Sequence, residues 1–253
     1  PVVSSAASDV YKRQQLQRIK IDMVFQKKEN HFKSLLLADM DSTMIEQECI
    51  DELADMCGVG SEVKKITTRA MNGELGFHDA LNERVSLLAQ CPSSIVEQVL
   101  EKRITFRPGG KTLVSTMKAN GAYTALVSGG FTAFSIPIGT NLGFDEQHAN
   151  ILVEENGVFT GKVAEPILGK NEKVNQLNRL VKERGLMHSD VLAVGDGAND
   201  LGMLAIAGTG VAMHAKPIVA EKCDIVINHC DLSSLLYLQG YKKEDFVSTE
   251  IDY

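Results

Sequence analysis

Two aspartates in a D-x-D motif constrain this chain more than any other feature of its sequence. Asp39 and Asp41 follow the apolar run LLLA at 35–38, which is too short for a helix and is typical of a buried parallel strand. In an open α/β sheet, ligands bind in the crevice at the carboxyl ends of such strands. The pair therefore marks a candidate site, although D-x-D at a strand end is as typical of a turn closed by side-chain hydrogen bonds.

A second acidic cluster follows another apolar run far downstream. The run VLAV at 191–194 also predicts a buried strand, and it leads into GDGAND at 195–200. If both strands belong to one parallel sheet, the first two aspartates converge with Asp196 and Asp200 on a small volume. Like charges so close repel unless a cation neutralises them, and oxygen ligands at this charge density favour Mg²⁺ together with a substrate phosphate. The sequence therefore predicts a magnesium site and a phosphate-bearing substrate.

Two further elements are compatible with phosphate binding. The run YTALV at 123–127 predicts a third strand, and Ser128, Gly129 and Gly130 after it offer a hydroxyl and close backbone amides to an anion. Taken alone, S-G-G is more often a plain turn. Lys173 lies at the head of a predicted amphipathic helix, where the ordinary expectation is a solvated surface lysine.

Taken in order, these motifs resemble a known family. DMDST at 39–43, SGG at 128–130, a lysine at 173 and GDGAND at 195–200 are similar to the four motifs of the haloacid dehalogenase superfamily of phosphotransferases. The stretch 48–88, with ECIDELA, VKKIT, AMNG and RVSLL, resembles the helical cap of the branch that hydrolyses O-phospho-L-serine. The resemblance covers about residues 33 to 238. Four separated motifs in order are a specific signal, whereas each alone is weak.

The resemblance implies a role for each motif residue. Asp39 is expected to be the nucleophile that forms an aspartyl-phosphate, and Asp41 the general acid and then the general base. Asp39, Asp196 and the Asp41 carbonyl are expected to bind Mg²⁺, with Asp200 supporting the site from behind. The groups expected to bind the phosphoryl oxygens are Ser128, the Gly129 amide and Lys173, and Asn199 is expected to be a further substrate-binding residue.

Substrate selectivity is expected to come from the cap. The resemblance places Glu48 at the substrate ammonium and Arg84 at its carboxylate, for which a guanidinium has bidentate geometry. Met71 and Phe77 are expected to be apolar walls of the same pocket. Spacing alone favours surface positions on amphipathic helices for the charged pair, and either apolar residue is also compatible with an ordinary core position.

The predicted fold class is α/β, with a Rossmann-like parallel sheet core of the haloacid dehalogenase type and an inserted helical cap. The expected divisions are a disordered or non-native leader at 1–14, a remnant of an N-terminal regulatory domain at 15–32, the core at 33–48 and 107–240, the cap at 49–106 and a C-terminal tail at 241–253. The alternating sequence IKIDMV at 19–24 resembles the last strand of a ferredoxin-like regulatory domain. Asn156-Gly157 predicts a β-hairpin, and a late strand at 224–227 precedes a closing helix at 232–238.

Composition narrows the class of protein. The 253 residues carry a formal net charge of −7 and no tryptophan, which argues against nucleic acid binding. The chain has no apolar run long enough to span a membrane and no signal-peptide pattern, so a soluble protein is expected. Five cysteines without C-x-x-C spacing predict reduced thiols and a cytoplasmic location. The expected partner is a small-molecule substrate, and a homodimer is compatible with these observations.

Three functions compete. The first is a Mg²⁺-dependent phosphatase that releases L-serine from O-phospho-L-serine, ending serine biosynthesis. The second is a phosphatase or phosphotransferase of the same superfamily acting on another small phosphomonoester such as phosphohomoserine. The third is a phospho-accepting signalling module, because receiver domains also combine strand-end aspartates with Mg²⁺ and a lysine. A receiver has no cap bearing Glu48 and Arg84, so this third function ranks last.

Overall fold

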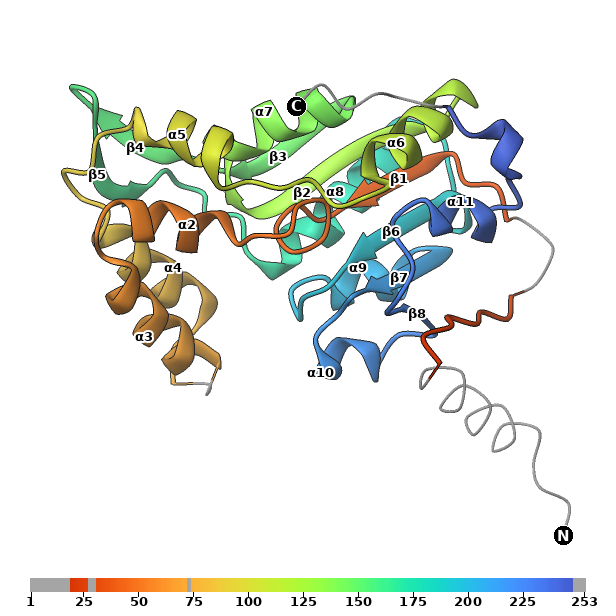
Figure 1. Cartoon of the computed structure of the whole chain (residues 1–253), viewed down its shortest axis with the longest axis horizontal. Helices are drawn as coiled ribbons and strands as arrows, with labels where there is room; N and C mark the ends of the chain where they lie inside the picture. Colours follow the sequence, from red (N-terminus) through yellow and green to blue (C-terminus); the bar gives the residue numbers. More distant parts are fainter. Residues whose placement is uncertain (1–18, 27–30, 72–73, 248–253) are drawn as a thin grey trace, which may run out of the picture.

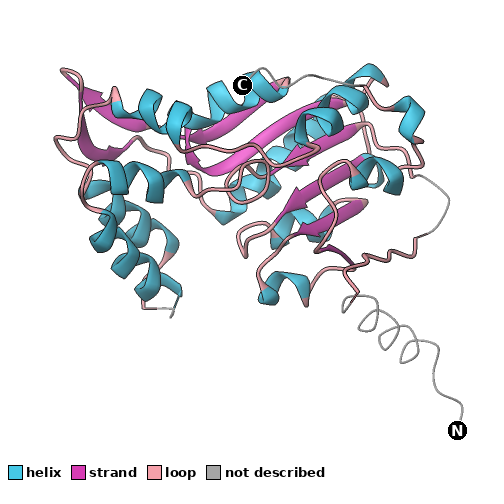
Figure 2. Cartoon of the chain, in the orientation of Figure 1, coloured by secondary structure: helices cyan, strands magenta, loops and turns pink. Residues whose placement is uncertain are grey.

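A six-stranded parallel sheet runs through the middle of the protein (Figures 1 and 2). The computed structural model describes residues 19–26, 31–71 and 74–247. The strand order is β3-β2-β1-β6-β7-β8, and every pair is parallel. The strands are β1 (Leu35–Ala38), β2 (Tyr123–Phe131), β3 (Glu146–Asn150), β6 (Val191–Gly195), β7 (Thr209–Met213) and β8 (Ile225–Ile227). The predicted α/β fold class is therefore confirmed, with β1 between the two other strands that the motifs predicted.

Helices cover both faces of this sheet because the side chains of each strand alternate between them. In β1, Leu36 and Ala38 belong to one hydrophobic cluster, whereas Leu35 and Leu37 belong to a second. The first cluster includes α6 (Gly110–Ala119), α7 (Thr132–Leu142) and α11 (Ser234–Leu238). The second includes α8 (Lys170–Glu183), α9 (Leu201–Ile206) and α10 (Pro217–Ala220). Burial on both faces explains why β1 has no polar residue.

The segment between β1 and α6 is helical and extends to one side of the sheet (Figure 1). Its described helices are α2 (Cys49–Met56), α3 (Gly60–Met71), α4 (Phe77–Ser86) and α5 (Ile95–Lys102). Helix α4 contacts β5 (Val158–Val163), which pairs antiparallel with β4 (Leu152–Glu155). The predicted hairpin is thus confirmed, and Asn156 and Gly157 at its turn both have positive φ, at 52° and 79°.

The two connections between the helical segment and the sheet lie side by side. Ile45 forms an antiparallel bridge with Phe106. The Glu46 amide donates a hydrogen bond to the Thr105 carbonyl at 2.9 Å, and the Arg107 amide donates to the Met44 carbonyl at 3.0 Å. The chain therefore leaves and re-enters the sheet layer at one place.

Residues 19–24 do not form the strand that their alternating sequence resembles. Residues 19–26 contain no strand, and within the described ranges no strand pairs with them. The side chains of Ile19 and Ile21 are exposed. Instead the Asp22 carboxylate accepts hydrogen bonds from the amides of residues 228–230 at 2.8 to 3.0 Å. The predicted leader at 1–14 lies outside the described residues. The late strand and closing helix are confirmed as β8 and α11, and two short 3₁₀ helices are η1 (His188–Asp190) and η2 (Lys243–Asp245).

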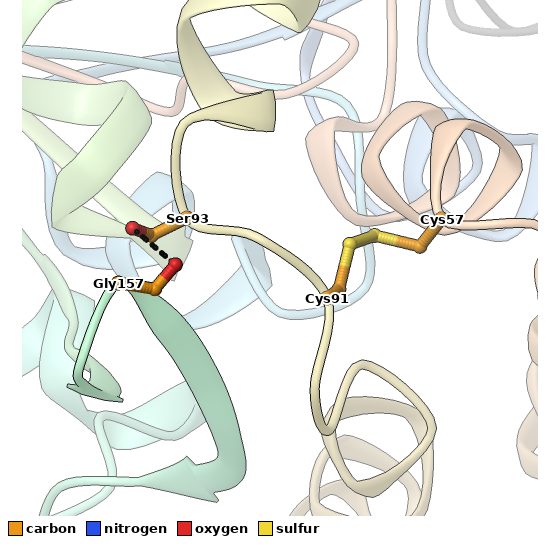
Figure 3. Close-up of a disulfide and its surroundings, with 4 residues drawn as sticks. All are labelled: Cys57, Cys91, Ser93 and Gly157. Atoms are coloured by element: carbon orange, nitrogen blue, oxygen red, sulfur yellow. Dashed lines mark hydrogen bonds between the residues drawn. A yellow bond between two sulfur atoms is a disulfide. The ribbon is translucent and has the colours of Figure 1, made fainter.

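A disulfide joins the end of α2 to the loop between α4 and α5 (Figure 3). Cys57 is the C-cap residue of α2, and Cys91 follows α4, with a Cα–Cα distance of 5.9 Å. The segment after Cys91 is itself fixed to the β4–β5 hairpin, because the Ser93 amide and hydroxyl donate to the Gly157 carbonyl at 3.0 and 3.3 Å (Figure 3). The prediction of reduced thiols is therefore wrong for this pair, whose separation of 34 residues gives no local motif. The free cysteines are Cys49, Cys223 and Cys230.

We expect this cross-link to contribute to stability. A double variant, Cys57→Ala with Cys91→Ala, should lose about 3 to 4 kcal/mol of free energy of unfolding, because the closed loop restricts the unfolded chain. Urea unfolding followed by circular dichroism measures the loss, and Cys230→Ala serves as the control. Equal stability of the wild type with and without dithiothreitol would contradict a disulfide in solution.

Candidate active site

The predicted site residues meet because β1 and β6 end at the same level, beside the last third of β2. Ala38 is in register with Leu126 of β2 and with Val194 of β6. Asp39 directly follows Ala38, and Ser128 and Asp196 each come two residues after the register partners. The Asp39 amide also donates to the Val194 carbonyl at 3.0 Å. The carboxyl edge of the sheet therefore presents residues from two of the predicted motifs beside Asp39.

Three carboxylates form a buried acidic cluster at this edge. Asp39, Asp196 and Asp200 are 5%, 4% and 0% exposed, and each offers an oxygen within 4.8 Å of the others. Thr43 donates its hydroxyl hydrogen to Asp196 Oδ1 at 3.1 Å. Carboxylate and hydroxyl oxygens are ligands that suit a hard divalent cation. The cluster therefore has the chemistry of a cation site.

Lys173 supplies a positive charge within this cluster. Its Nζ lies 2.5 Å from Asp39 Oδ1 and 2.5 Å from Asp200 Oδ1. Burial disfavours the charged lysine, but Asp200 and Asp39 outweigh burial and raise its pKa. The pKa of Asp39 is also raised well above its usual value, by burial and by Asp200, despite the lysine. One lysine therefore does not neutralise the three carboxylates, and a further cation would favour the ionised form of Asp39.

Asp200 supports the cluster from behind. Its Oδ2 accepts hydrogen bonds from the amides of Asp196 at 3.1 Å and Gly197 at 2.8 Å, while its Oδ1 faces Lys173. A side chain at Gly195 would lie within 2.4 to 2.7 Å of Asp200, so only glycine leaves room there. The GDGAND motif therefore needs its first glycine for packing and its last aspartate for holding the turn.

The Asp41 carboxylate is not part of the acidic cluster, contrary to the expected convergence of all four aspartates. The strand ends at Ala38 and the chain turns, so Asp39 and Asp41 do not keep strand spacing. Asp41 Oδ1 accepts the Cys49 amide hydrogen at 2.8 Å, and Oδ2 accepts from the Ser128 hydroxyl at 3.1 Å. Asp41 is therefore held between the first turn of α2 and the S-G-G motif.

A small pocket lies between the S-G-G motif and α4. Its lining includes Phe77, Ser128, Gly129, Lys173 and Asn199, and it has room for about one water molecule. A side chain at Gly129 would meet the Phe77 ring at 3.6 Å, so the two elements nearly touch. The structure thus brings together four residues predicted to bind the substrate and one predicted apolar wall.

Asn150 was not predicted, yet it shapes this pocket. Its side chain donates to the Gly129 carbonyl at 2.9 Å and accepts from the Leu168 amide at 2.7 Å. The residue is 2% exposed at the end of β3. A buried asparagine at a strand end was the available signal, but β3 itself had no clear apolar pattern.

Glu48 directly precedes α2, Arg84 lies in α4, and the charge of Glu48 acts on Arg84. Glu48 is the N-cap residue of α2, and its Oε1 accepts from the Ser42 hydroxyl at 2.9 Å. Nearby protein atoms limit its hydration and Asp41 adds a negative charge, which raises the pKa of Glu48 to about 7 although its side chain is 44% exposed. Burial lowers the pKa of Arg84, whereas Asp51, Glu48 and Asp41 act to raise it. Arg84 is therefore close enough to Glu48 for their charges to interact.

Lys216 is a second residue that sequence reasoning missed, and it is charged. Its Nζ lies 3.9 Å from both Glu48 Oε1 and Asp196 Oδ2, and its amide donates to the Asp196 carbonyl at 3.1 Å. It follows β7 at the same edge of the sheet, which was the available signal. Met71, predicted as an apolar wall, is the last residue of α3, and its side chain lies outside the described part of the structure.

Comparisons with known proteins agree with this geometry. The model of the haloacid dehalogenase-like hydrolase family matches residues 36–205. The phosphoserine phosphatase of Methanocaldococcus jannaschii is 44% identical over 204 residues, which span 81% of this chain and 96% of that protein. The phosphoserine phosphatase of Archaeoglobus fulgidus is 41% identical over 233 residues, spanning 90% of this chain and 67% of that protein.

A solved structure is similar as well. A phosphoserine phosphatase described as a phospho-aspartyl intermediate analogue superposes with a TM-score of 0.75 at 43% identity, covering 81% of this chain and 98% of its own. The chain belongs to the haloacid dehalogenase-like hydrolases. Among the described residues, no helix is both long and apolar enough to cross a membrane.

Proposed function

We propose that the protein is a phosphatase that converts O-phospho-L-serine and water to L-serine and phosphate through an aspartyl-phosphate on Asp39. The observation that carries this proposal is the buried cluster of Asp39, Asp196 and Lys173 at the sheet edge. Lys216 lies 3.9 Å from both Glu48 and Asp196, and the charge of Glu48 acts on Arg84. A carboxylate and a guanidinium complement an amino acid, and the cluster complements its phosphate. Curated relatives that are 41% to 45% identical are phosphoserine phosphatases.

The first half of the reaction transfers the phosphoryl group. An Asp39 carboxylate oxygen attacks phosphorus, the bond from phosphorus to the serine oxygen breaks, and protonated Asp41 gives its proton to that oxygen. Lys173 is within 2.5 Å of Asp39, so its charge lies next to the phosphoryl oxygens as they move onto the nucleophile. Ser128, the Gly129 amide and Asn199 line the same pocket and complete the binding of those oxygens.

The second half releases phosphate. Asp41, now ionised, takes a proton from a water molecule whose oxygen attacks phosphorus, and the bond from phosphorus to Asp39 breaks. The hydrogen bonds from the Cys49 amide and the Ser128 hydroxyl hold the Asp41 carboxylate in place for both steps. One residue thus serves as acid and then as base, as microscopic reversibility of the alcohol and water steps allows.

The residues also fit a magnesium ion. Asp39, Asp196 and the Asp41 carbonyl would hold it, with Asp200 fixing the Asp196 turn. Bound Mg²⁺ neutralises the carboxylates and draws charge from the phosphoryl oxygens. One lysine does not balance the negative charge of the three carboxylates, and this supports the assignment of a bound cation.

We further propose the division into a core at 33–48 and 107–240 and a cap at 49–106, with a C-terminal tail from 241. The side-by-side connections at Ile45 and Phe106 support these limits. A cytoplasmic role at the end of serine biosynthesis belongs to the same proposal. The cysteines do not support that location, because Cys57 and Cys91 are paired, so it rests on the substrate alone. The regulatory remnant at 15–32 and the homodimer stay predictions.

Phosphate release from a panel of phosphomonoesters tests the function. The panel contains O-phospho-L-serine, phosphohomoserine, O-phospho-L-threonine and p-nitrophenyl phosphate. We expect the highest kcat/KM for O-phospho-L-serine. Higher kcat/KM for phosphohomoserine would favour the alternative substrate within the same superfamily. A signalling module is not favoured, because the chain belongs to a hydrolase family.

The nucleophile gives the first prediction for this site. Asp39→Asn should abolish turnover and leave circular dichroism unchanged, because the amide oxygen cannot form the acyl-phosphate. Mass analysis after rapid quenching with substrate should show a phosphorylated wild type and an unmodified variant. Asp224→Asn, an exposed aspartate, is the control. Near wild-type turnover by Asp39→Asn would sink the assignment.

The proposed magnesium ion gives the second prediction for this site. Excess chelator should remove activity, Mg²⁺ should restore it, and Ca²⁺ should inhibit because its larger coordination shell does not preserve the geometry. Mg²⁺ should also raise the Tm of the wild type and not that of Asp196→Asn, since only a bound ligand stabilises the folded state. Full activity in chelator, or equal Tm shifts, would exclude this site.

Arg84 gives the third prediction for this site. Arg84→Ala should lower kcat/KM for O-phospho-L-serine by roughly tenfold to a hundredfold, the effect of losing a charge-assisted hydrogen bond. The value for p-nitrophenyl phosphate, which lacks a carboxylate, should change little. The matched control is Arg103→Ala, an exposed arginine after α5. Equal losses on both substrates would mean that Arg84 is structural.

A further inference from the structure

Ser42 has an unusual backbone conformation between the catalytic aspartates and the helical segment. Its φ is 56°, in the left-handed region that residues other than glycine rarely adopt. Such a conformation persists only where neighbouring contacts impose it, and it is concentrated at functional sites. The question is therefore what holds Ser42 there and what its side chain does.

The backbone of Ser42 is held from both sides. Its amide donates to the Gln47 carbonyl at 3.1 Å, and its carbonyl accepts from Arg107 Nε at 3.1 Å. Arg107 belongs to the returning connection, where its own amide donates to Met44. The connection that leaves the sheet and the connection that re-enters it thus fix this one residue together.

The side chain of Ser42 is directed at Glu48. Its hydroxyl donates to Glu48 Oε1 at 2.9 Å. Among the described residues, the structure shows no other hydrogen bond to this carboxylate, and Lys216 approaches it only to 3.9 Å. A glutamate that is 44% exposed has several rotamers available, so one fixed oxygen restricts it and leaves the second oxygen for a ligand.

The neighbouring residue makes a useful contrast. Thr43 donates its hydroxyl hydrogen to Asp196 in the acidic cluster, whereas Ser42 contacts none of the three cluster carboxylates through its hydroxyl. Two adjacent hydroxyl residues therefore serve different parts of the site. Ser42 contacts Glu48, which is proposed to bind the substrate, whereas Thr43 contacts Asp196 in the acidic cluster.

We propose that Ser42 is a positioning residue for specificity, which holds the Glu48 carboxylate where it meets the ammonium group of the substrate. This inference rests on the proposed function in one respect, that Glu48 reads an ammonium group. It extends that function to Ser42, which does not take part in the reaction itself, and it explains why the backbone of Ser42 is left-handed. Arg107 contributes by holding the Ser42 carbonyl.

The test uses two variants of the full chain. Ser42→Ala removes the hydroxyl, and Ser42→Gly removes it while accepting φ of 56° without strain, so it remains informative if the alanine variant folds poorly. We expect kcat/KM for O-phospho-L-serine to fall about fivefold to tenfold, mainly through KM, the effect of one lost hydrogen bond. Values for p-nitrophenyl phosphate should stay within about twofold. Ser61→Ala, which removes an exposed serine–glutamate hydrogen bond of 2.8 Å on α3, is the matched control.

A second pair of substrates separates this inference from the proposed function. O-phosphoethanolamine carries an ammonium group without a carboxylate, and ethyl phosphate carries neither. The wild type should prefer the former, and Ser42→Gly and Glu48→Gln should each lose that preference. The double variant should lose no more than Glu48→Gln alone, because both changes remove one contact.

Three results would overturn the inference. They are equal losses on p-nitrophenyl phosphate and O-phospho-L-serine, an unchanged preference for O-phosphoethanolamine in Ser42→Gly, and additive losses in the double variant. A wild type that prefers O-phosphoethanolamine over O-phospho-L-serine would contradict the proposed substrate only. In that case the loss or retention of the ammonium preference still decides the role of Ser42.

Discussion

The ion pairs of Lys173 with Asp39 and Asp200 are the interaction on which the site depends. All three groups are at least 95% buried, so the two aspartates, and not water, stabilise the charge of the lysine. The sheet makes this possible, since the ends of β1 and β6 lie level and α8 begins beside them. Packing of Leu35 and Leu37 against α8 therefore does more than build a core, because it fixes a buried lysine between two aspartates.

The sequence predicted the parts of this site that are written as local patterns. Short apolar runs followed by aspartates marked β1 and β6, and the strand ends then had to meet at one edge. The patterns did not reveal where Asp41 points, because that depends on the chain turning after Ala38. Nor did they reveal Lys216, Asn150 or the Cys57–Cys91 pair, whose partners are distant in sequence. A strand at 19–24 was expected from alternation alone, but a strand forms only where another strand offers its edge.

The helices beside the sheet are stabilised differently from the core. The sheet buries its strands on both faces, whereas the disulfide joins the end of α2 to the loop after α4, and the Ser93 contacts fix the following segment to the hairpin (Figure 3). The cross-link connects the helix that starts after Glu48 with the segment that follows the helix bearing Arg84. The relative position of these two charges is therefore restrained at one end by a covalent bond and at the other by the sheet connections.

The neighbouring connections at Ile45 and Phe106 have a consequence for how such proteins diversify. Because the two ends of the insertion lie together, a segment of another length or shape can replace residues between them without moving any strand. The strand-end aspartates would stay in register while the groups that face the substrate were exchanged. Chemistry and selectivity can thus change independently, and grafting the helical segment of a relative between these two positions is a direct route to a phosphatase with a different substrate.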